Sequence, residues 1–265
     1  MNLLLQVLAN GLVLGSIYAI MAFGLAMVYG VMRVINFAHG VLAVLAAYIT
    51  FQLFKSLRID PFLSLVVTVP LFFALGWLIY KGLVGRLGVY ARSSSMVLTF
   101  GLGIAIEVLI ILIWTTDFKS IVPSYSDQSI VLGPVRLSYP RLIALGLAIT
   151  MVWILRMFFV ATKAGKAIRA VIQDREAATY VGVDIEYVSS LTFAIAIATV
   201  AVGGALLGTI YAFYPAVHLD WIGRLFAIVV LGGMGSVTGA FLGAYLIALA
   251  ESLVSLYFGL AWSPM

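Results

Sequence analysis

The chain contains no cysteine and only two histidines among 265 residues. The absence of cysteine excludes disulfide bonds, thiol catalysis and thiolate metal ligands, and two histidines are too few for a protein-built zinc or haem site. Charged residues make up only 9% of the chain, against about 25% in an ordinary soluble domain. With 15 basic and 10 acidic residues, the net charge of +5 is too small for a basic surface that binds nucleic acid. We therefore predict no metal, no cofactor and no nucleic-acid partner.

Hydrophobic residues make up 64% of the chain and occur in long, continuous runs. A helix needs about 20 apolar residues to cross a bilayer, whereas the strands of a membrane barrel alternate apolar and polar residues. The runs predict an all-α polytopic membrane protein with seven or eight transmembrane helices, some broken or re-entrant, in one domain over residues 1–265. The expected spans are Leu3–Tyr29, Val41–Phe54, Phe62–Tyr80, Met96–Trp114, Leu142–Phe159, Val188–Phe213, the surroundings of Phe226–Leu231, and Thr238–Phe258.

Lysine and arginine are concentrated in two predicted loops, Lys81–Ser95 and Ala161–Tyr187. Two spans separate these loops, so both lie on one face of the membrane, and basic loops are retained in the cytoplasm. The turn-rich loop at about 115–141 and the N-terminus are then expected outside. A re-entrant segment near Asn36 would change this count.

Polar side chains interrupt the apolar pattern at Val34–Gly40, where Asn36 and His39 occur at membrane depth. Such groups need protein or water partners, so this segment is expected to face a packed interior or a cavity. The alternative is that Asn36 and His39 only form hydrogen bonds between helices.

Four glycines occur within Gly232–Gly239, between two apolar runs. Each glycine costs about 1 kcal/mol relative to alanine inside a helix, so this stretch predicts a broken helix. Broken helices of transporters expose backbone groups to the substrate. The alternative is a tight helical hairpin with close packing.

The segment Gly165–Gly182 has an apolar stripe and mixed charges elsewhere. This pattern predicts one amphipathic helix outside the membrane, set across a loop at about 161–187. Its acidic and amide groups make it a poor ligand for anionic lipid headgroups, so a protein partner suits it better than an interfacial position.

Two carboxylates, Glu107 and Glu251, occur singly within predicted spans, with no basic residue at helical spacing. They are the main support for the alternative of a secondary, ion-coupled transporter. We expect them to form hydrogen bonds between helices or to lie near a membrane interface. His218 and Asp220 are expected to be solvated in an outer loop.

Several of these stretches together closely resemble the LivH-type permeases of branched-chain amino acid ABC transporters. The matching stretches are Gly15-Ser16-Ile17-Tyr18-Ala19-Ile20, Val28-Tyr29-Gly30, Asn36-Phe37-Ala38-His39-Gly40, Thr99-Phe100-Gly101-Leu102, Gly165–Gly182 and Val230–Ser236 with Gly239. Glu176-Ala177-Ala178-x-x-x-Gly182 also looks like the element with which ABC import permeases dock their ATPases, although no Ile-x-Leu-Pro follows it.

The resemblance implies a permease that carries branched-chain amino acids, or related small amino acids and amides, across the bacterial inner membrane. It implies a second permease subunit (related, or a second copy), two cytoplasmic ATPase chains and a periplasmic substrate-binding protein. No phosphate-binding motif occurs here, so the chain is not expected to be an enzyme. Relatives continue beyond a tryptophan such as Trp262, so an end at Met265 would lie outside and mark a truncated form.

The resemblance and the polar breaks together give the expected site residues. The expected substrate path is lined by Asn36, Phe37, His39, Gly40, Thr99, Gly101, Gly232, Gly233, Gly235 and Ser236. The expected ATPase-coupling residues are Gly165, Ile168, Arg169, Val171, Ile172, Asp174, Glu176, Ala177, Ala178 and Gly182, with Ile168, Val171 and Ile172 filling a groove on the ATPase.

Overall fold

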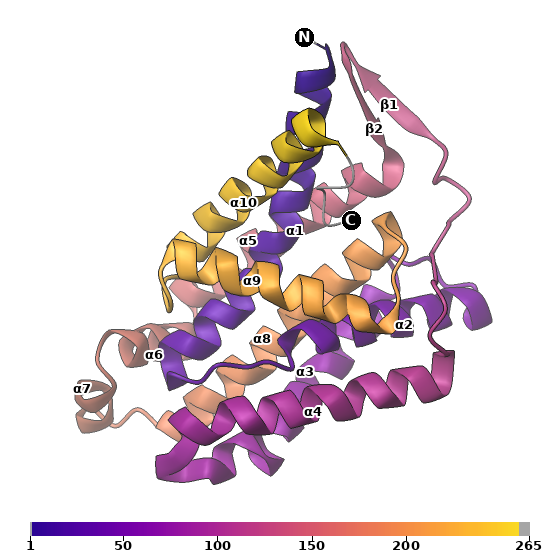
Figure 1. Cartoon of the computed structure of the whole chain (residues 1–265). Coiled ribbons are helices and arrows are strands. Elements are labelled where there is room, and N and C mark those ends of the chain that lie inside the picture. Colours follow the sequence, from indigo (N-terminus) through magenta and orange to yellow (C-terminus); the bar gives the residue numbers. More distant parts are fainter. Residues whose placement is uncertain (1, 260–265) are drawn as a thin grey trace.

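The computed structural model describes residues 2–259, apart from the side chains of Asn2, residues 88–93 and Leu132. The expectation about Trp262 and Met265 concerns residues outside this range. Among the described residues, eight helices are long and apolar enough to cross a membrane, which confirms the all-α polytopic fold (Figure 1). The elements are α1 (Asn2–Met32), α2 (His39–Leu57), α3 (Leu65–Gly82), η1 (Val84–Tyr90), α4 (Ala91–Trp114), β1 (Ser129–Leu132), β2 (Val135–Ser138), α5 (Tyr139–Ala161), α6 (Lys163–Gln173), α7 (Arg175–Tyr180), α8 (Ile185–Ile210), η2 (Pro215–Val217), α9 (His218–Gly232) and α10 (Val237–Phe258).

Helices α1 and α8 form the centre of the bundle. The membrane-length windows of α1 and α8 are 89% and 94% buried, against 17% for α5. Small residues allow the central helices to approach closely: a Cβ on Gly24 of α1 would lie 2.5 Å from Thr199 Oγ1 of α8. Helices in lipid associate through such close packing, because burial of apolar surface drives association only weakly there.

The chain folds back into the bundle after α1. Arg33 has a φ of 57°, and α2 begins only at His39. The His39 ring lies beside Met21, whose carbonyl oxygen is 3.0 Å from Nε2. Since Met21 precedes the end of α1 by 11 residues, α2 begins about 16 Å inside the end of α1.

A second interruption follows α8. The strand-like segment after Tyr211 pairs with the outer loop, where the Phe213 N–H donates to the Lys119 carbonyl over 2.9 Å. The chain then re-enters the bundle, and α9 begins at His218. A Cβ on Gly40 would lie only 2.6 Å from the His218 carbonyl oxygen, so α2 and α9 begin side by side. His218 is 8% exposed, and the expectation that it is solvated in a loop is wrong.

The outer loop carries a short hairpin that the sequence analysis did not predict. β1 and β2 pair antiparallel from Ser129 opposite Ser138 to Leu132 opposite Val135. The Gln6 side chain of α1 accepts from the Arg136 N–H and donates to its carbonyl oxygen, and this holds the hairpin at the N-terminal end of α1 (Figure 1).

The loop before α3 is joined to the same outer layer. The Tyr125 hydroxyl donates a hydrogen bond to the Asp60 carboxylate. Burial and this hydrogen bond raise the pKa of Tyr125. The two loops are therefore held together by a polar contact as well as by stacking of Phe62 on Tyr125.

Candidate functional site

The break at residues 33–38 is held by polar contacts to two helices. Asn36 is fully buried, and its Oδ1 accepts from the Ala38 N–H at the start of α2. Thr99 of α4 accepts from the Phe37 N–H over 3.0 Å and lies 3.3 Å from the Ile35 carbonyl oxygen. The structure thus brings together Thr99 and the segment Asn36–Gly40, which the sequence analysis assigned to one path.

Two buried nitrogens in this segment have no hydrogen-bond partner among the described residues, namely Asn36 Nδ2 and His39 Nδ1. The Met21 carbonyl can only accept, so the proton of a neutral His39 ring is on Nε2 and Nδ1 is an acceptor. Buried polar atoms are normally paired, and the exceptions point to strain, a function or a bound water.

Phe37 lies at the edge of the break and joins α4 to α9. Its ring centroid lies 5.0 Å from that of Phe226 and 6.3 Å from that of Phe100. Gly101 beside Phe100 and Gly223 in α9 are exposed, and nothing lies within 4 Å of a Cβ built on either. We call this surface the α4–α9 face: Phe37, Phe100, Gly101, Ala105, Gly223, Phe226 and Ala227.

Both intramembrane carboxylates have a basic partner on α9. Glu107 Oε2 of α4 lies 3.1 Å from His218 Nε2, and Glu251 Oε1 of α10 lies 3.1 Å from Arg224 Nε. Tyr18 of α1 also donates to Glu251. The expectation of hydrogen bonds between helices is confirmed for Glu251, whereas Glu107 has a close contact to the His218 ring. Neither carboxylate is isolated. Helical spacing could not reveal the partners, because each lies on another helix.

The glycine-rich stretch forms a tight turn between α9 and α10, as the alternative interpretation held. A Cβ on Gly239 would lie 1.7 Å from the Gly232 carbonyl oxygen, so the two backbones touch. Gly233 and Gly235 have φ values of 89° and 88°, and Ser236 Oγ accepts from the Gly239 N–H at the start of α10. The broken helix expected here is wrong: the stretch ends one helix and caps the next.

This turn lies at another level of the bundle than the break at Asn36–Gly40. Gly235 packs on Gly30 near the end of α1, whereas His39 lies beside Met21. Nine residues of helix separate Met21 from Gly30, which is about 13 Å. The structure therefore does not bring Gly232–Ser236 together with Asn36–Gly40, and a path role for the turn stays a prediction.

The segment Gly165–Gly182 forms two helices, and the expectation of a single helix is wrong. Asp174 separates them, and its carboxylate accepts from the N–H groups of Glu176 and Ala177, which caps α7. Competition of such a side chain with the helical backbone favours caps over helix interiors. Gly165 packs on α5, where a Cβ would lie 2.3 Å from the Phe158 carbonyl oxygen, and Gly182 ends the segment with a φ of 82°.

The apolar stripe of this segment faces the chain itself. Ile168 and Val171 are 0% and 3% exposed, and with Ala178 they pack on Met27 and Val31 of α1. The expectation that Ile168, Val171 and Ile172 fill a groove on a partner is therefore corrected, since Ile172 is also partly buried in this cluster. The residues left exposed include Arg169, Asp174, Glu176, Ala177, Tyr180 and Val181.

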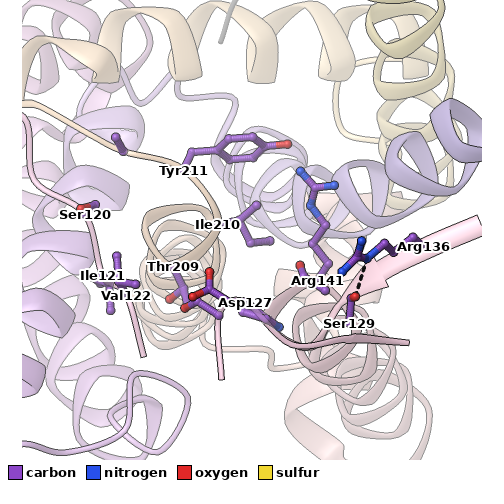
Figure 2. A pocket seen from close by; sticks show the side chains of 14 residues that line it. Ser120, Ile121, Val122, Asp127, Ser129, Arg136, Arg141, Thr209, Ile210 and Tyr211 are labelled. Atoms are coloured by element: carbon purple, nitrogen blue, oxygen red, sulfur yellow. Dashed lines mark hydrogen bonds between the residues drawn. The ribbon is translucent and has the colours of Figure 1, made fainter. Parts of the chain in front are cut away.

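A polar cleft of about 490 Å³ opens between the outer loop, the start of α5 and the end of α8 (Figure 2). Arg141 donates to Asn10 Oδ1 over 2.8 Å, and Arg136 Nε donates to Ser129 Oγ. Neither arginine forms an ion pair within the part of the chain that is described. The lining residues are Ser120, Ile121, Val122, Ser126, Asp127, Ser129, Arg136, Ser138, Pro140, Arg141, Thr209, Ile210, Tyr211 and Ala212.

Sequence reasoning missed this cleft. The available signal was the pair of arginines in a loop that the positive-inside rule places outside, where basic residues are fewer. Figure 2 shows the Arg141 guanidinium reaching toward the Tyr211 hydroxyl, with Asp127 in the lower part of the view. The cleft therefore offers donors for an anion and one carboxylate for a cation.

The eight apolar helices found in the described part of the chain define a multi-pass membrane protein. The sequence model of the family described as "Branched-chain amino acid transport system / permease component" matches residues 7–265. The chain belongs to this family of permeases.

Individual relatives agree with the family match. The high-affinity branched-chain amino acid transport system permease protein LivH of Escherichia coli K12 is 31% identical over 268 residues, covering 96% of this chain and 86% of the relative. BraD of Pseudomonas aeruginosa, named as the same kind of permease, is 30% identical, and the alignment covers 96% of this chain and 87% of BraD. A probable LivH of Methanocaldococcus jannaschii is 25% identical, and the alignment covers 97% of this chain and 83% of the relative. No solved structure matches the chain.

Proposed function

We propose that this chain is the transmembrane permease subunit of an ATP-binding cassette importer in the bacterial inner membrane. Its substrates are branched-chain amino acids or related small amino acids and amides. The ATPase activity belongs to two separate cytoplasmic chains, and a periplasmic binding protein delivers the substrate. The main support is the match of residues 7–265 to a family of transport permeases.

The segment α6–α7 is the proposed contact with the ATPases. Its buried side, with Ile168 and Val171, fixes it to α1, and Arg175 adds a hydrogen bond to the Val31 carbonyl oxygen. Its outer side exposes Tyr180 and Val181, which are 87% and 80% exposed. A segment attached in this way transmits a push from the ATPases to the helices as a rigid body.

The α4–α9 face is the proposed contact with the second permease subunit and one wall of the substrate path. Two small-xxx-small pairs, Gly101 with Ala105 and Gly223 with Ala227, are exposed on it. Small residues at this spacing let helices of two subunits approach closely in a membrane. Phe37 belongs to the break at Asn36–Gly40 and contacts Phe226 of α9, so the break adjoins this face.

The outer cleft is the proposed first site for the substrate inside the permease. An α-amino acid carries a carboxylate, which suits Arg141 and Tyr211, and an ammonium group, which suits Asp127. The apolar lining residues Ile121, Val122 and Ile210 suit an aliphatic side chain. A volume of about 490 Å³ lies within the usual range for small-molecule sites.

Uptake of radiolabelled leucine into proteoliposomes tests the proposal. Vesicles with this chain, a second permease subunit, the ATPases and the binding protein should accumulate leucine when ATP is present on the ATPase side. Vesicles without the ATPases should not, whatever proton or sodium gradient is applied. Gradient-driven uptake by the chain without ATPases would overturn the proposal in favour of a secondary transporter.

A further inference from the structure

We propose that the groove between α1, α5, α6 and α10 binds an anionic phospholipid of the cytoplasmic leaflet. The groove has a volume of about 660 Å³, and most of its lining is apolar, including Phe23, Phe159 and Phe241. Its polar groups come mainly from two arginines, Arg156 and Arg169, with Gln173 beside them. The inference rests on the orientation proposed above, in which α6 lies at the cytoplasmic face.

The position of Arg156 calls for an anion. Arg156 precedes the end of α5 by five residues, so its backbone lies about 7–8 Å inside the helix end. An arginine near the end of a membrane helix extends toward the headgroup layer and pairs there with an acceptor. Among the described residues, neither Arg156 nor Arg169 takes part in an ion pair.

The two arginines come from different elements but line the same groove. Arg156 belongs to the membrane helix α5, and Arg169 belongs to α6 outside it. A phosphate contacted by both guanidinium groups would lie at the boundary between the apolar groove and the aqueous phase. The rest of the ligand must be apolar, because the groove continues along Val152, Ile20 and Phe241.

These features favour a lipid over a soluble phosphate compound or a protein surface. A soluble phosphate has no group to fill the apolar part, whereas one acyl chain fills it. A helix of a neighbouring subunit would leave both guanidinium groups without an anion. Basic groups on the cytoplasmic side attract anionic headgroups in general. The segment Gly165–Gly182 as a whole suits such headgroups poorly, but this groove takes only Arg169 of its basic residues and combines it with Arg156 of α5.

The bound lipid would connect the proposed coupling segment with the helices that it must move. Ile172 and Gln173 of α6 line the groove opposite Val237 and Thr238 of α10. A lipid between them fills the space between the coupling segment and the α9–α10 turn. ATP turnover of the assembled transporter should therefore depend on anionic lipid.

Native mass spectrometry of the purified transporter, loaded with phosphatidylglycerol in phosphatidylcholine nanodiscs, provides the test. The wild-type chain should retain phosphatidylglycerol, and the Arg156→Gln, Arg169→Gln variant should retain about tenfold less. The Lys163→Gln, Lys166→Gln variant removes the same charge from α6 at two positions that do not line the groove, and it should retain as much as wild type. Val152→Trp fills the groove without changing the charge and should also lose the lipid.

Equal retention by all four proteins would overturn the inference. A native chain without cysteine allows a further measurement, in which Val160→Cys is labelled with a benzophenone maleimide and probed for photo-cross-links to the second permease. An efficient cross-link together with no retained lipid would show a subunit interface and overturn the inference as well. Transport that continues normally in that case leaves the proposed function intact, so the two failures are distinguishable.

Discussion

Individual residues in this chain are paired across helices where the membrane allows no unpaired charge. Glu107 and Glu251 belong to α4 and α10, and both meet basic residues of α9. The short helix α9 is thus held to α10 by the ion pair of Arg224 with Glu251, and to α4 by the contact of His218 with Glu107. Removing one partner of a buried ion pair lowers the free energy of unfolding by more than the pair itself contributes, because an unpaired buried charge remains.

The pair of Arg224 and Glu251 gives the first prediction. Arg224→Met should lower the free energy of unfolding by about 3 kcal/mol, because Glu251 loses its partner. The double variant Arg224→Met, Glu251→Leu should recover most of this loss. Thermal unfolding of the purified chain in detergent measures both.

The exposed pair of Lys81 and Glu186 is the matched control, with side chains 45% and 67% exposed. Lys81→Met should cost about 0–1 kcal/mol, since exposed pairs contribute little. The prediction would be contradicted if the Arg224→Met, Glu251→Leu double variant lost as much free energy of unfolding as the two single variants lose together.

The outer cleft gives a second prediction at the level of single residues. Arg141→Gln should raise the leucine concentration needed for half-maximal uptake by about 10–100-fold, because a charge-assisted hydrogen bond to the carboxylate is lost. Leucinamide has no carboxylate, so its inhibition constant against leucine uptake should change little. Competition assays with the same binding protein measure both constants.

Lys55→Gln, at an exposed position near the end of α2, is the control and should leave uptake unchanged. Arg141 also holds Asn10, and loss of this contact alone would have a purely structural effect. Such an effect would weaken the binding of leucine and of leucinamide equally, and that outcome would contradict recognition of the carboxylate.

At the level of elements, the segment α6–α7 has an inner side that serves folding and an outer side that is free for a partner. Val171 belongs to the inner side and packs on α1 and α8, whereas Tyr180 and Val181 lie outside. Burying an aliphatic side chain stabilises by about 1.5–3 kcal/mol. A charged side chain introduced on the inner side should therefore lower the stability of the permease, whereas one on the outer side should affect the binding of a partner.

This difference gives the third prediction. Val181→Asp together with Tyr180→Ala should reduce co-purification of the ATPase chains at least several-fold, without lowering the thermal stability of the permease. Val171→Asp should instead lower the stability of the permease itself, because a charge would enter the cluster around Met27. Pull-down of the ATPases and thermal unfolding are measured in parallel. Normal ATPase retention by the first variant would exclude the outer side of α7 as the contact.

At the level of the whole molecule, the central helices are enclosed while the α4–α9 face is open. α1 and α8 form the interior, and α2 and α9 both begin beside each other inside the bundle (Figure 1). The break before α2 contains Phe37, which contacts Phe226 of α9 on this face. A second permease subunit placed on this face would enclose a path between the two chains.

The fourth prediction uses two glycines with equal space around them. Gly223 of the α4–α9 face and Gly146 of α5 are both exposed, with nothing within 4 Å of an added Cβ. Gly223→Trp should abolish association with the second permease and leucine uptake, while Gly146→Trp should allow both. Size-exclusion chromatography measures assembly, and both variants should keep the thermal stability of the wild-type chain. Normal assembly of the Gly223→Trp variant would place the interface elsewhere.

The sequence by itself determined the fold class and the positions of the interruptions. Apolar runs of membrane length, the loops rich in lysine and arginine, and the polar residues Asn36 and His39 are properties of composition and local order. The bilayer imposes long apolar helices on a chain that crosses it, because backbone polar groups must be satisfied within each helix. Polar residues at membrane depth are rare for the same reason, so they stand out in the sequence. The glycines of Gly232–Gly239 predict an interruption at this place, but in the form of a broken helix, whereas the structure has a tight turn between two helices.

Only the tertiary structure decided which groups meet. Glu107 and Glu251 find their partners on α9, Ile168 and Val171 turn toward α1, and Arg141 joins Asp127 and Tyr211 in one cleft. These neighbouring residues lie on different elements, far apart in the sequence, so the spacing of residues along one helix does not reveal that they meet. Which side of an amphipathic helix faces its own chain depends on how the helices pack, and that packing is set by close contacts such as Gly24 on Thr199.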